Sequence, residues 1–225
     1  MKTVILSLGG SIIVPDEVDY FFLKDFKSFV INYIKKDYRF IIFCGGGQTN
    51  RKYNRAARRV SYVKDKDLDW IGIMSSRLNA ELIRVIFGDL AYKKVLYNPN
   101  KKVTTKKQVI VAHGLKPEYS KDYYSVHIKK KMNIKEILNL TNISYVYDKD
   151  PSENPDAKKI KEISWKDYRK LIDKDWSPRL STPFDPIASK EAQQQKNKVV
   201  ILKGTDLKNL EKYFEDREFE GTVIQ

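Results

Sequence analysis

Cysteine and histidine are scarce in this sequence, with one cysteine and two histidines among 225 residues. Because Cys44, His113 and His127 are the only such side chains, we expect no structural zinc site. A lone cysteine forms no internal disulfide, and its place in an apolar run is typical of a reducing cytoplasm. No apolar run approaches the roughly 20 residues of a membrane span, and no signal segment precedes the first predicted strand. We therefore expect a cytoplasmic chain without a membrane partner.

Acidic residues are few relative to basic ones: 29 Asp and Glu against 43 Lys and Arg give a formal net charge of +14. Such a charge first suggests a nucleic-acid partner. The basic residues, however, form short, scattered clusters such as Lys35-Lys36 and Lys129-Lys130-Lys131, and no aromatic RNA-binding motif or zinc-finger spacing occurs. We interpret the charge as solvated faces and loops with a general attraction to anionic ligands such as nucleotides. Nucleic acid is therefore not the expected partner, and a basic protein that binds RNA is the least favoured of our hypotheses.

Glycine is also uncommon, yet five of the ten glycines lie in two short loops before residue 50. Gly9 and Gly10 follow the apolar stretch at 4–8, and Gly45, Gly46 and Gly47 follow the stretch at 40–44. Glycine lets the backbone turn sharply and lets a ligand approach it closely. Two such loops at strand ends predict one cleft that holds phosphates with backbone N–H groups. Plain tight turns are the alternative.

The rest of the chain alternates helical and strand-like patterns. Apolar residues at helical spacing predict a helix over 22–33, followed by a strand at 39–43. A second helix is expected over about 69–87, with Arg77 and Asn79 at exposed positions and an apolar side made of Trp70, Met74, Leu78, Leu82 and Val85. Further strands are expected at 95–97, 108–111, 134–140 and 199–202, a hairpin-like segment at 141–151, an edge strand at 221–224, an irregular segment at 175–186, and helices at 165–172, 187–195 and 207–214. This alternation predicts βαβ units around a parallel sheet.

The order of these motifs resembles a known family. The stretches that carry the resemblance are Leu8-Gly9-Gly10-Ser11, Gly45-Gly46-Gly47 with Arg51 and Tyr53, Asp69 to Ile73 with Arg77 to Ala80, Lys116-Pro117 with Ser120 to Asp122, Thr141-Asn142, Val146-Tyr147, Asp150-Pro151, Asp185-Pro186 and Gly221-Thr222. In this order they are similar to the amino acid kinase family, most closely its uridylate (UMP) kinase branch of archaeal type and the relatives in small-genome bacteria.

The resemblance implies a three-layer α/β/α sandwich around a mainly parallel sheet, formed as a single domain over residues 1–225. It implies transfer of the γ-phosphoryl of ATP to UMP, giving UDP in pyrimidine nucleotide biosynthesis. It further implies Mg²⁺ bound through ATP rather than by protein ligands, and a homo-oligomer, either a hexamer or a dimer. Such transfer needs aligned phosphates and compensating charge more than a protein nucleophile.

Site residues follow from the same resemblance. Arg51, Gly10 and Ser11 are implied as catalytic. The implied ATP-binding residues are Gly9, Gly10, Ser11, Gly46, Arg51, Asn142, Tyr147 and Asp150. The implied UMP-binding residues are Gly45, Gly46, Gly47, Asp69, Asn79, Leu115, Lys116, Pro117, Ser120 and Lys121. Charge for the transition state is expected from Arg51, Lys116, Lys121 and Lys203 together with Mg²⁺.

A second hypothesis stays open beside UMP kinase activity. His113, Glu118 and Lys121 occupy positions where the resemblance implies Gly, Gly and Thr. A side chain at a former glycine restricts the backbone, and Glu118 adds an anion near the phosphates. These residues favour a kinase of the same fold with another small acceptor, or a nucleotide-binding member with little catalysis.

Overall fold

The computed structural model describes residues 1–98, 103–172 and 182–225. Its strands are β1 (Lys2–Leu8), β2 (Tyr38–Cys44), β3 (Val109–Ala112), β4 (Glu136–Thr141), β5 (Val146–Tyr147), β6 (Lys159–Ile160), β7 (Glu162–Ile163), β8 (Lys198–Lys203) and β9 (Thr222–Ile224). Its helices are α1 (Gly10–Ile13), α2 (Tyr20–Lys35), α3 (Gly47–Val60), α4 (Asp65–Phe87), α5 (Lys121–Met132), α6 (Trp165–Leu171), α7 (Pro186–Gln194) and α8 (Leu207–Phe214), with a short 3-10 turn η1 (Gly88–Leu90) after α4.

A seven-stranded sheet in the order β3-β2-β1-β4-β8-β9-β7 forms the centre of the molecule. β1 pairs in parallel with β2 and β4, β3 joins β2 in parallel, and β8 joins β4 in parallel. β9 runs antiparallel to β8 and parallel to β7. The expected mainly parallel sheet is therefore confirmed. Because β1 lies inside the sheet, between β2 and β4, the loop that follows it lies beside the carboxyl ends of its two parallel neighbours.

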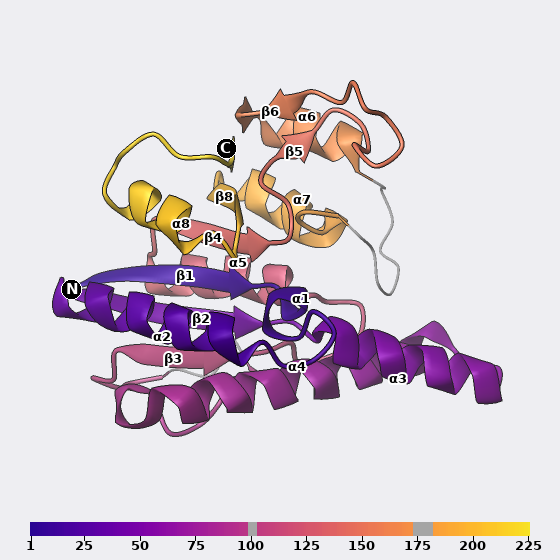
Figure 1. Ribbon diagram of the computed structural model, residues 1–225, viewed down its shortest axis with the longest axis horizontal. Helices are drawn as coiled ribbons and strands as arrows, with labels where there is room; N and C mark the ends of the chain where they lie inside the picture. Colours follow the sequence, from indigo (N-terminus) through magenta and orange to yellow (C-terminus); the bar gives the residue numbers. More distant parts are fainter. Residues whose placement is uncertain (99–102, 173–181) are drawn as a thin grey trace.

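Helices cover both faces of this sheet (Figure 1). Side chains alternate along β1, so Val4, Leu6 and Leu8 join one apolar core, whereas Ile5 joins the other. The first core includes side chains of α2, α4 and α8, and the second includes side chains of α5, α6 and α7. The three-layer sandwich is confirmed. Figure 1 also shows α3 extending past the carboxyl ends of the strands, away from the N-terminus.

The helix expected over 22–33 is α2, and its apolar face is buried as the spacing predicts. The Asp19 side chain caps its start by accepting the Phe22 N–H at 2.9 Å. Phe26 is fully buried and lies edge-on to Phe87 of α4, with 6.4 Å between ring centroids. The aromatic side chains of α2 therefore join two helices of the same layer.

The second expected helix is α4, which begins earlier, at Asp65. Most of its predicted apolar side faces outward: Trp70, Met74 and Leu78 are 44%, 50% and 64% exposed, whereas Leu82 packs against the core. A second stripe packs on the sheet instead, formed by Ala80, Ile83 and Phe87, with Asn79 buried beside them. The prediction of an exposed Asn79 was wrong. The helix carries two apolar stripes, and the sheet takes the one with the small Ala80, which lets the helix approach closely.

Three smaller expectations need correction. The strand expected at 95–97 is a single bridge from Leu96 to Ala112. The hairpin-like segment at 141–151 contributes β5, whose partner β6 lies beyond that segment. β9 is not an edge strand, because β7 pairs with its other side.

Most of the irregular segment at 175–186 lies outside the described residues. Among the described helices, none is long and apolar enough to cross a membrane.

Candidate functional site

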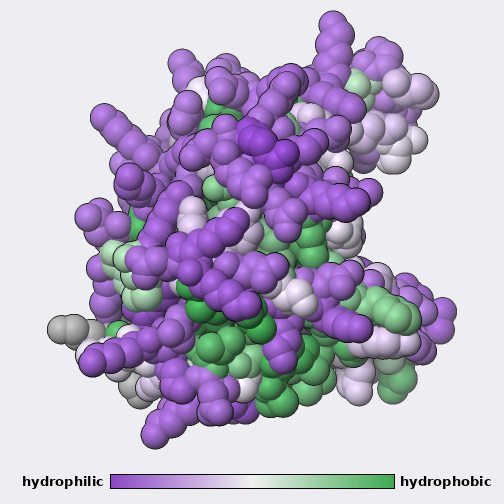
Figure 2. Space-filling model, turned by 60° about the vertical axis from the view of Figure 1, so that its left-hand side comes forward, coloured by the Kyte–Doolittle hydropathy of each residue, from purple (hydrophilic) through white to green (hydrophobic). Residues whose placement is uncertain are grey.

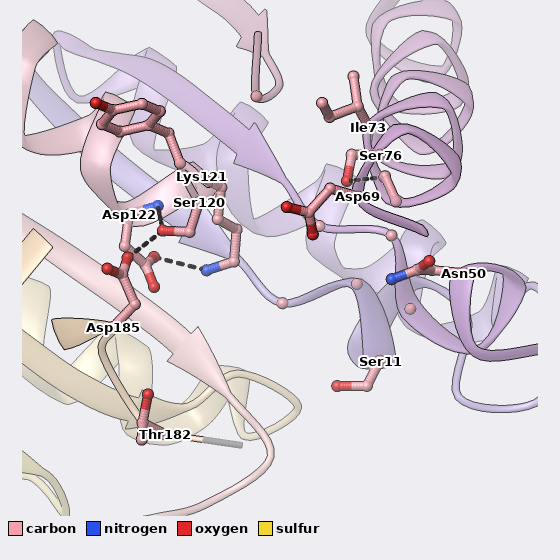
Figure 3. A pocket seen from close by; sticks show the side chains of 18 of the residues that line it. Ser11, Asn50, Asp69, Ile73, Ser76, Ser120, Lys121, Asp122, Thr182 and Asp185 are labelled. Atoms are coloured by element: carbon pink, nitrogen blue, oxygen red, sulfur yellow. Dashed lines mark hydrogen bonds and ion pairs between the residues drawn. The ribbon is translucent and has the colours of Figure 1, made fainter. Parts of the chain in front are cut away.

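A cavity of about 310 Å³ opens at the carboxyl ends of the central strands. Open α/β sheets bind their ligands at this edge. One part of the wall consists of the glycine loops after β1 and β2 and the first half of α4. The other part consists of the loop before α5, the end of β4 and the residues just before α7. In Figure 3, Ser120, Lys121, Asp122 and Asp185 gather on one side, and Asn50, Asp69, Ile73 and Ser76 lie on the other.

The two glycine loops are in direct backbone contact. A Cβ added at Gly10 would lie 2.1 Å from the Gly47 nitrogen and 2.5 Å from the Gly45 carbonyl carbon. Gly47 also has a φ of +64°, a conformation that other residues rarely adopt. Only glycines allow this approach, so the two predicted loops form one continuous backbone surface on the cavity floor.

Helices begin at this floor without side-chain caps. Gly9 precedes α1 and Gly46 precedes α3, and neither helix start receives a side-chain hydrogen bond. By contrast, Ser120 caps α5 and Asp185 caps α7. A helix start carries partial positive charge and N–H donors that suit phosphate groups. The floor is therefore suited to an anionic ligand held by backbone.

A polar network joins β1, β4 and the start of α5 at the cavity, where Lys121, Asp122 and Asn139 are lining residues. The Lys121 ammonium donates to Ser7 Oγ, to Asp122 Oδ1 at 2.9 Å and to Asn139 Oδ1 at 3.3 Å. Ser7 Oγ donates in turn to Asp122 Oδ1 at 2.7 Å. Ser7, Asp122 and Asn139 are buried. The ion pair of Lys121 with Asp122 therefore satisfies polar groups that would otherwise be costly to bury.

A second carboxyl group, Asp185, is also buried in the wall. It accepts the Ser120 hydroxyl and the Ala188 N–H, the latter at 2.8 Å. Burial raises the pKa of Asp185 to about 6, and the nearby Asp122 carboxylate adds to the increase. Part of the wall therefore changes charge close to neutral pH.

Contacts from α4 fix both loops that it faces. The Asn79 amide donates to the Gly45 carbonyl at 2.7 Å, which ties the second glycine loop to the helix. Asp69 Oδ2 accepts the N–H of Glu118 at 3.0 Å, and Glu118 has a φ of +71°. This hydrogen bond holds the loop before α5 against α4 at the cavity.

Most of the predicted site residues meet in this one cavity. The lining includes Gly9, Gly10, Ser11, Gly45, Gly46, Gly47, Arg51, Asp69, Lys116, Pro117, Ser120 and Lys121. Asn79 lies behind the lining, where it holds Gly45. Leu115, Asn142, Tyr147 and Asp150 are outside the lining. Arg51 is exposed, and its Nε donates to Gln48 Oε1 at 2.6 Å.

Several lining residues were not assigned a role from the sequence: Asn50, Gly72, Ser76, Asp122, Asn139, Thr141, Thr182 and Asp185. A signal existed for Asn139, because an amide inside the apolar stretch 134–140 is unusual in a buried strand. Ser7 gives the same signal in β1. Residues such as Asn50 and Thr182 carry no such signal.

Other candidate groups have no place in the cavity. Among residues 1–98, 103–172 and 182–225, no cluster of three or more His, Cys, Asp or Glu could hold a metal. Cys44 is buried, which raises its pKa. His113 is buried behind the loop, and burial lowers its pKa. The neutral forms of both groups are therefore favoured at neutral pH.

Residues 2–203 match the model of the amino acid kinase family. The chain belongs to this family. The uridylate kinase of Methanoregula boonei is 31% identical over 216 residues, which cover 93% of this chain and 90% of that protein. The uridylate kinase of Sulfurisphaera tokodaii is 29% identical over 203 residues, 88% of each chain.

Solved structures agree with this membership. The uridylate kinase of Archaeoglobus fulgidus matches over 100% of both chains, with a TM-score of 0.81 and 26% identity. The UMP kinase of Ureaplasma parvum has a TM-score of 0.75 at 16% identity, covering 100% of this chain and 98% of that chain, which supports the fold alone. The fold expected from the motif order is thus the fold of the family.

Proposed function

We propose that the protein is a UMP kinase, which transfers the γ-phosphoryl group of ATP to UMP and so serves pyrimidine nucleotide biosynthesis. The observation that carries the proposal is the joined backbone of the two glycine loops, with two uncapped helix starts at one cavity. Two phosphate chains that meet in line need such a floor more than a protein nucleophile. The similarity to uridylate kinases over nearly the whole chain supports UMP as the acceptor.

The proposed division of the cavity follows its two sides. Gly9, Gly10 and Ser11 would hold the transferring phosphoryl group of ATP, with Arg51 at the edge. Gly45, Gly46 and Gly47, together with Asp69 and the loop at 115–121, would hold UMP, and Asn79 would keep Gly45 in place. Asn142 directly follows the lining residue Thr141, so we propose that Asn142, Tyr147 and Asp150 border the adenosine beyond the lining.

Mg²⁺ fits this arrangement as an ion that enters with ATP. The wall carboxylates already have partners: Asp122 has Lys121, Asp185 has Ser120, and Asp69 has the Glu118 N–H. A Mg²⁺ ion retains several waters and is commonly held through substrate phosphates. Bound in this way, it would neutralise phosphate charge. The protein residues would orient the two nucleotides and exclude water.

We also propose that the chain forms a homo-oligomer in the cytoplasm. Trp70, Met74, Leu78 and Val85 are exposed on α4, and Figure 2 shows an apolar area near the lower part of a mostly hydrophilic surface. An exposed apolar patch of this kind is favoured to be buried against a second copy of the chain rather than left in water. Light scattering of the parent and of Leu78→Glu tests this: the parent should exceed the mass of one chain, and the variant should dissociate.

A second candidate function keeps the fold and changes the acceptor. The observation that favours it is the loop before α5, where Glu118 is held by Asp69, a residue implied to bind the acceptor. Another small acceptor, or nucleotide binding with little turnover, would fit a site in which the Asp69 carboxylate already accepts a hydrogen bond from this loop.

The test is a direct assay of nucleoside diphosphate formation from ATP-Mg²⁺ and a panel of nucleoside monophosphates, separated by chromatography. UDP from UMP should form fastest. If UMP gives no product and calorimetry detects no UMP binding, the proposal is wrong. A different monophosphate as the best substrate would establish the second candidate.

A further inference from the structure

Lys121 differs from the other cations that line the cavity. Within the described part of the chain, the lining contains Arg51, Lys116 and Lys121 as its cationic side chains. Arg51 and Lys116 are exposed, and Lys116 lies over the Tyr119 ring at 4.6 Å. The Lys121 side chain is 18% exposed, and its ammonium donates to Ser7, Asp122 and Asn139. Among the lining cations that the structure describes, Lys121 is therefore the one with a fixed, shielded position.

The two strands that receive this ammonium define its place. Ser7 of β1 and Asn139 of β4 are directly paired in the parallel register, and the Lys121 ammonium contacts both side chains. One residue after Ser7 comes Leu8, the last residue of β1, and then Gly9 of the first loop. A Cβ built on Gly45 of the second loop would lie 3.5 Å from Lys121 Cε. The Lys121 side chain therefore lies beside Gly45, close to the point where the two glycine loops touch.

Of the three acceptors that the Lys121 ammonium contacts, the weakest can be replaced by a ligand oxygen. Its bond to Asp122 Oδ1 is short and charge-assisted at 2.9 Å, whereas its bond to Asn139 Oδ1 is long at 3.3 Å. Asn139 keeps another bond, because its amide donates to the Pro183 carbonyl. A phosphate oxygen that enters the cavity can therefore replace Asn139 as the third acceptor, while Ser7 and Asp122 continue to hold the ammonium in place.

We propose that Lys121 is the catalytic cation of this site, contacting the phosphoryl group during transfer, and that Ser7 and Asp122 are its positioning residues. The inference rests on the proposed phosphoryl transfer. In that step the bond from the γ-phosphorus to the β–γ bridging oxygen breaks and ADP leaves. A bond forms from the same phosphorus to a UMP phosphate oxygen. Negative charge spreads over the oxygens in between, and a preorganised cation stabilises it without moving a proton.

The first test compares Lys121→Met with Lys129→Met. Lys129 is a matched control: it lies on the same helix, is partly buried and bonds one amide oxygen, Asn197 Oδ1 at 2.7 Å, away from the cavity. We expect Lys121→Met to lower kcat by about 100-fold or more, with a much smaller change in KM for UMP, by analogy with loss of one transition-state donor. Lys129→Met should keep the parent kcat. Ser7→Ala should lower kcat by about tenfold, as a loss of positioning.

A second test separates catalysis from structural charge balance. Lys121→Met leaves Asp122 as an unpaired buried carboxylate, which can unfold the variant. The double variant Lys121→Met, Asp122→Asn removes both charges, and Asp122→Asn alone keeps the cation. We expect the double variant to fold and to stay at the low kcat. Asp122→Asn alone keeps the cation but loses one of its positioning partners, so we expect it to lower kcat by about tenfold, as Ser7→Ala does.

The outcomes distinguish this inference from the proposed function. A parent protein that makes no product from any monophosphate refutes the kinase proposal itself. An active parent whose double variant regains the parent kcat refutes the role of Lys121, because the cation would then be needed only to balance Asp122. A rise in KM for UMP with unchanged kcat in Lys121→Met would also refute it, because Lys121 would then bind acceptor only.

Discussion

The contact between the glycine loops makes Gly10→Ala the sharpest perturbation of the site. The added Cβ would lie 2.1 Å from the Gly47 nitrogen and 2.6 Å from the Gly45 oxygen. These neighbours are backbone atoms, so no side-chain rotation can relieve the overlap. To reach an ordinary contact of 3.4 Å from 2.1 Å, the loops must separate by about 1.3 Å.

That separation has two measurable effects. Overpacking of this kind typically costs about 1–3 kcal/mol in the free energy of unfolding. The loops would hold the two reacting phosphates, and a misplacement of about 1 Å can cost about 100-fold in rate. We therefore expect Gly10→Ala to lower kcat by about 100-fold at a temperature where the variant remains folded, with a smaller loss of stability.

The assay pairs UDP formation with urea unfolding, and Gly114→Ala is the control for stability. A Cβ on Gly114 would have its nearest neighbour at 3.6 Å, an ordinary contact. We expect that variant to unfold within about 1 kcal/mol of the parent, since Gly→Ala at a compatible position is neutral or mildly stabilising. Parent-like kcat in Gly10→Ala would refute the idea that the loop contact aligns the phosphates.

Two further predictions concern groups behind the floor and in the wall. Asn79→Ala leaves the Gly45 carbonyl without its 2.7 Å partner, so unfolding in urea should show a loss of about 1–3 kcal/mol; an unchanged midpoint would exclude a structural role. The pKa of Asp185 is raised from 3.8 to about 6, so its contribution to stability is greatest below pH 4 and is lost as pH rises through 6. At about 1.36 kcal/mol per unit, the parent should lose about 3 kcal/mol over that interval relative to Asp185→Asn, and parallel stability curves for the two proteins would contradict the burial argument.

Local sequence patterns predicted most helices and strands, because helical spacing and apolar stretches depend on residues close together in the sequence. The aromatic spacing of Phe22 to Tyr33 identified α2 and its buried face. The glycine loops were located by the apolar stretches before them. What local patterns could not supply was the choice between two apolar stripes on α4, since either satisfies the helical period. The buried position of Asn79 depends on that choice, and its partner Gly45 lies 34 residues away.

The hydrogen-bond network around Lys121 could not be predicted from local sequence patterns either. Ser7, Lys121 and Asn139 are far apart in the sequence, and only the pairing of β1 with β4 brings them together. The motif order pointed to Lys121 as part of an acceptor loop. It lies at the start of α5, one residue after the cap Ser120, and its side chain reaches Ser7 and Asn139 beside the glycine loops. Sequence alone contains the residue types but not this direction.

The balance of charge in the cavity argues that affinity for nucleotides does not come from the overall charge of +14. The lining holds the cations Arg51, Lys116 and Lys121 against the carboxyl groups of Asp69, Glu118, Asp122 and Asp185. Among the lining residues that the structure describes, three positive charges against four acidic groups give no local excess of cations, even when Asp185 is protonated. Phosphates must therefore be held mainly by backbone N–H groups and helix starts at the glycine loops. One shielded ammonium at the right place then matters more to the transition state than the many lysines on the surface, because solvent and salt screen exposed charges.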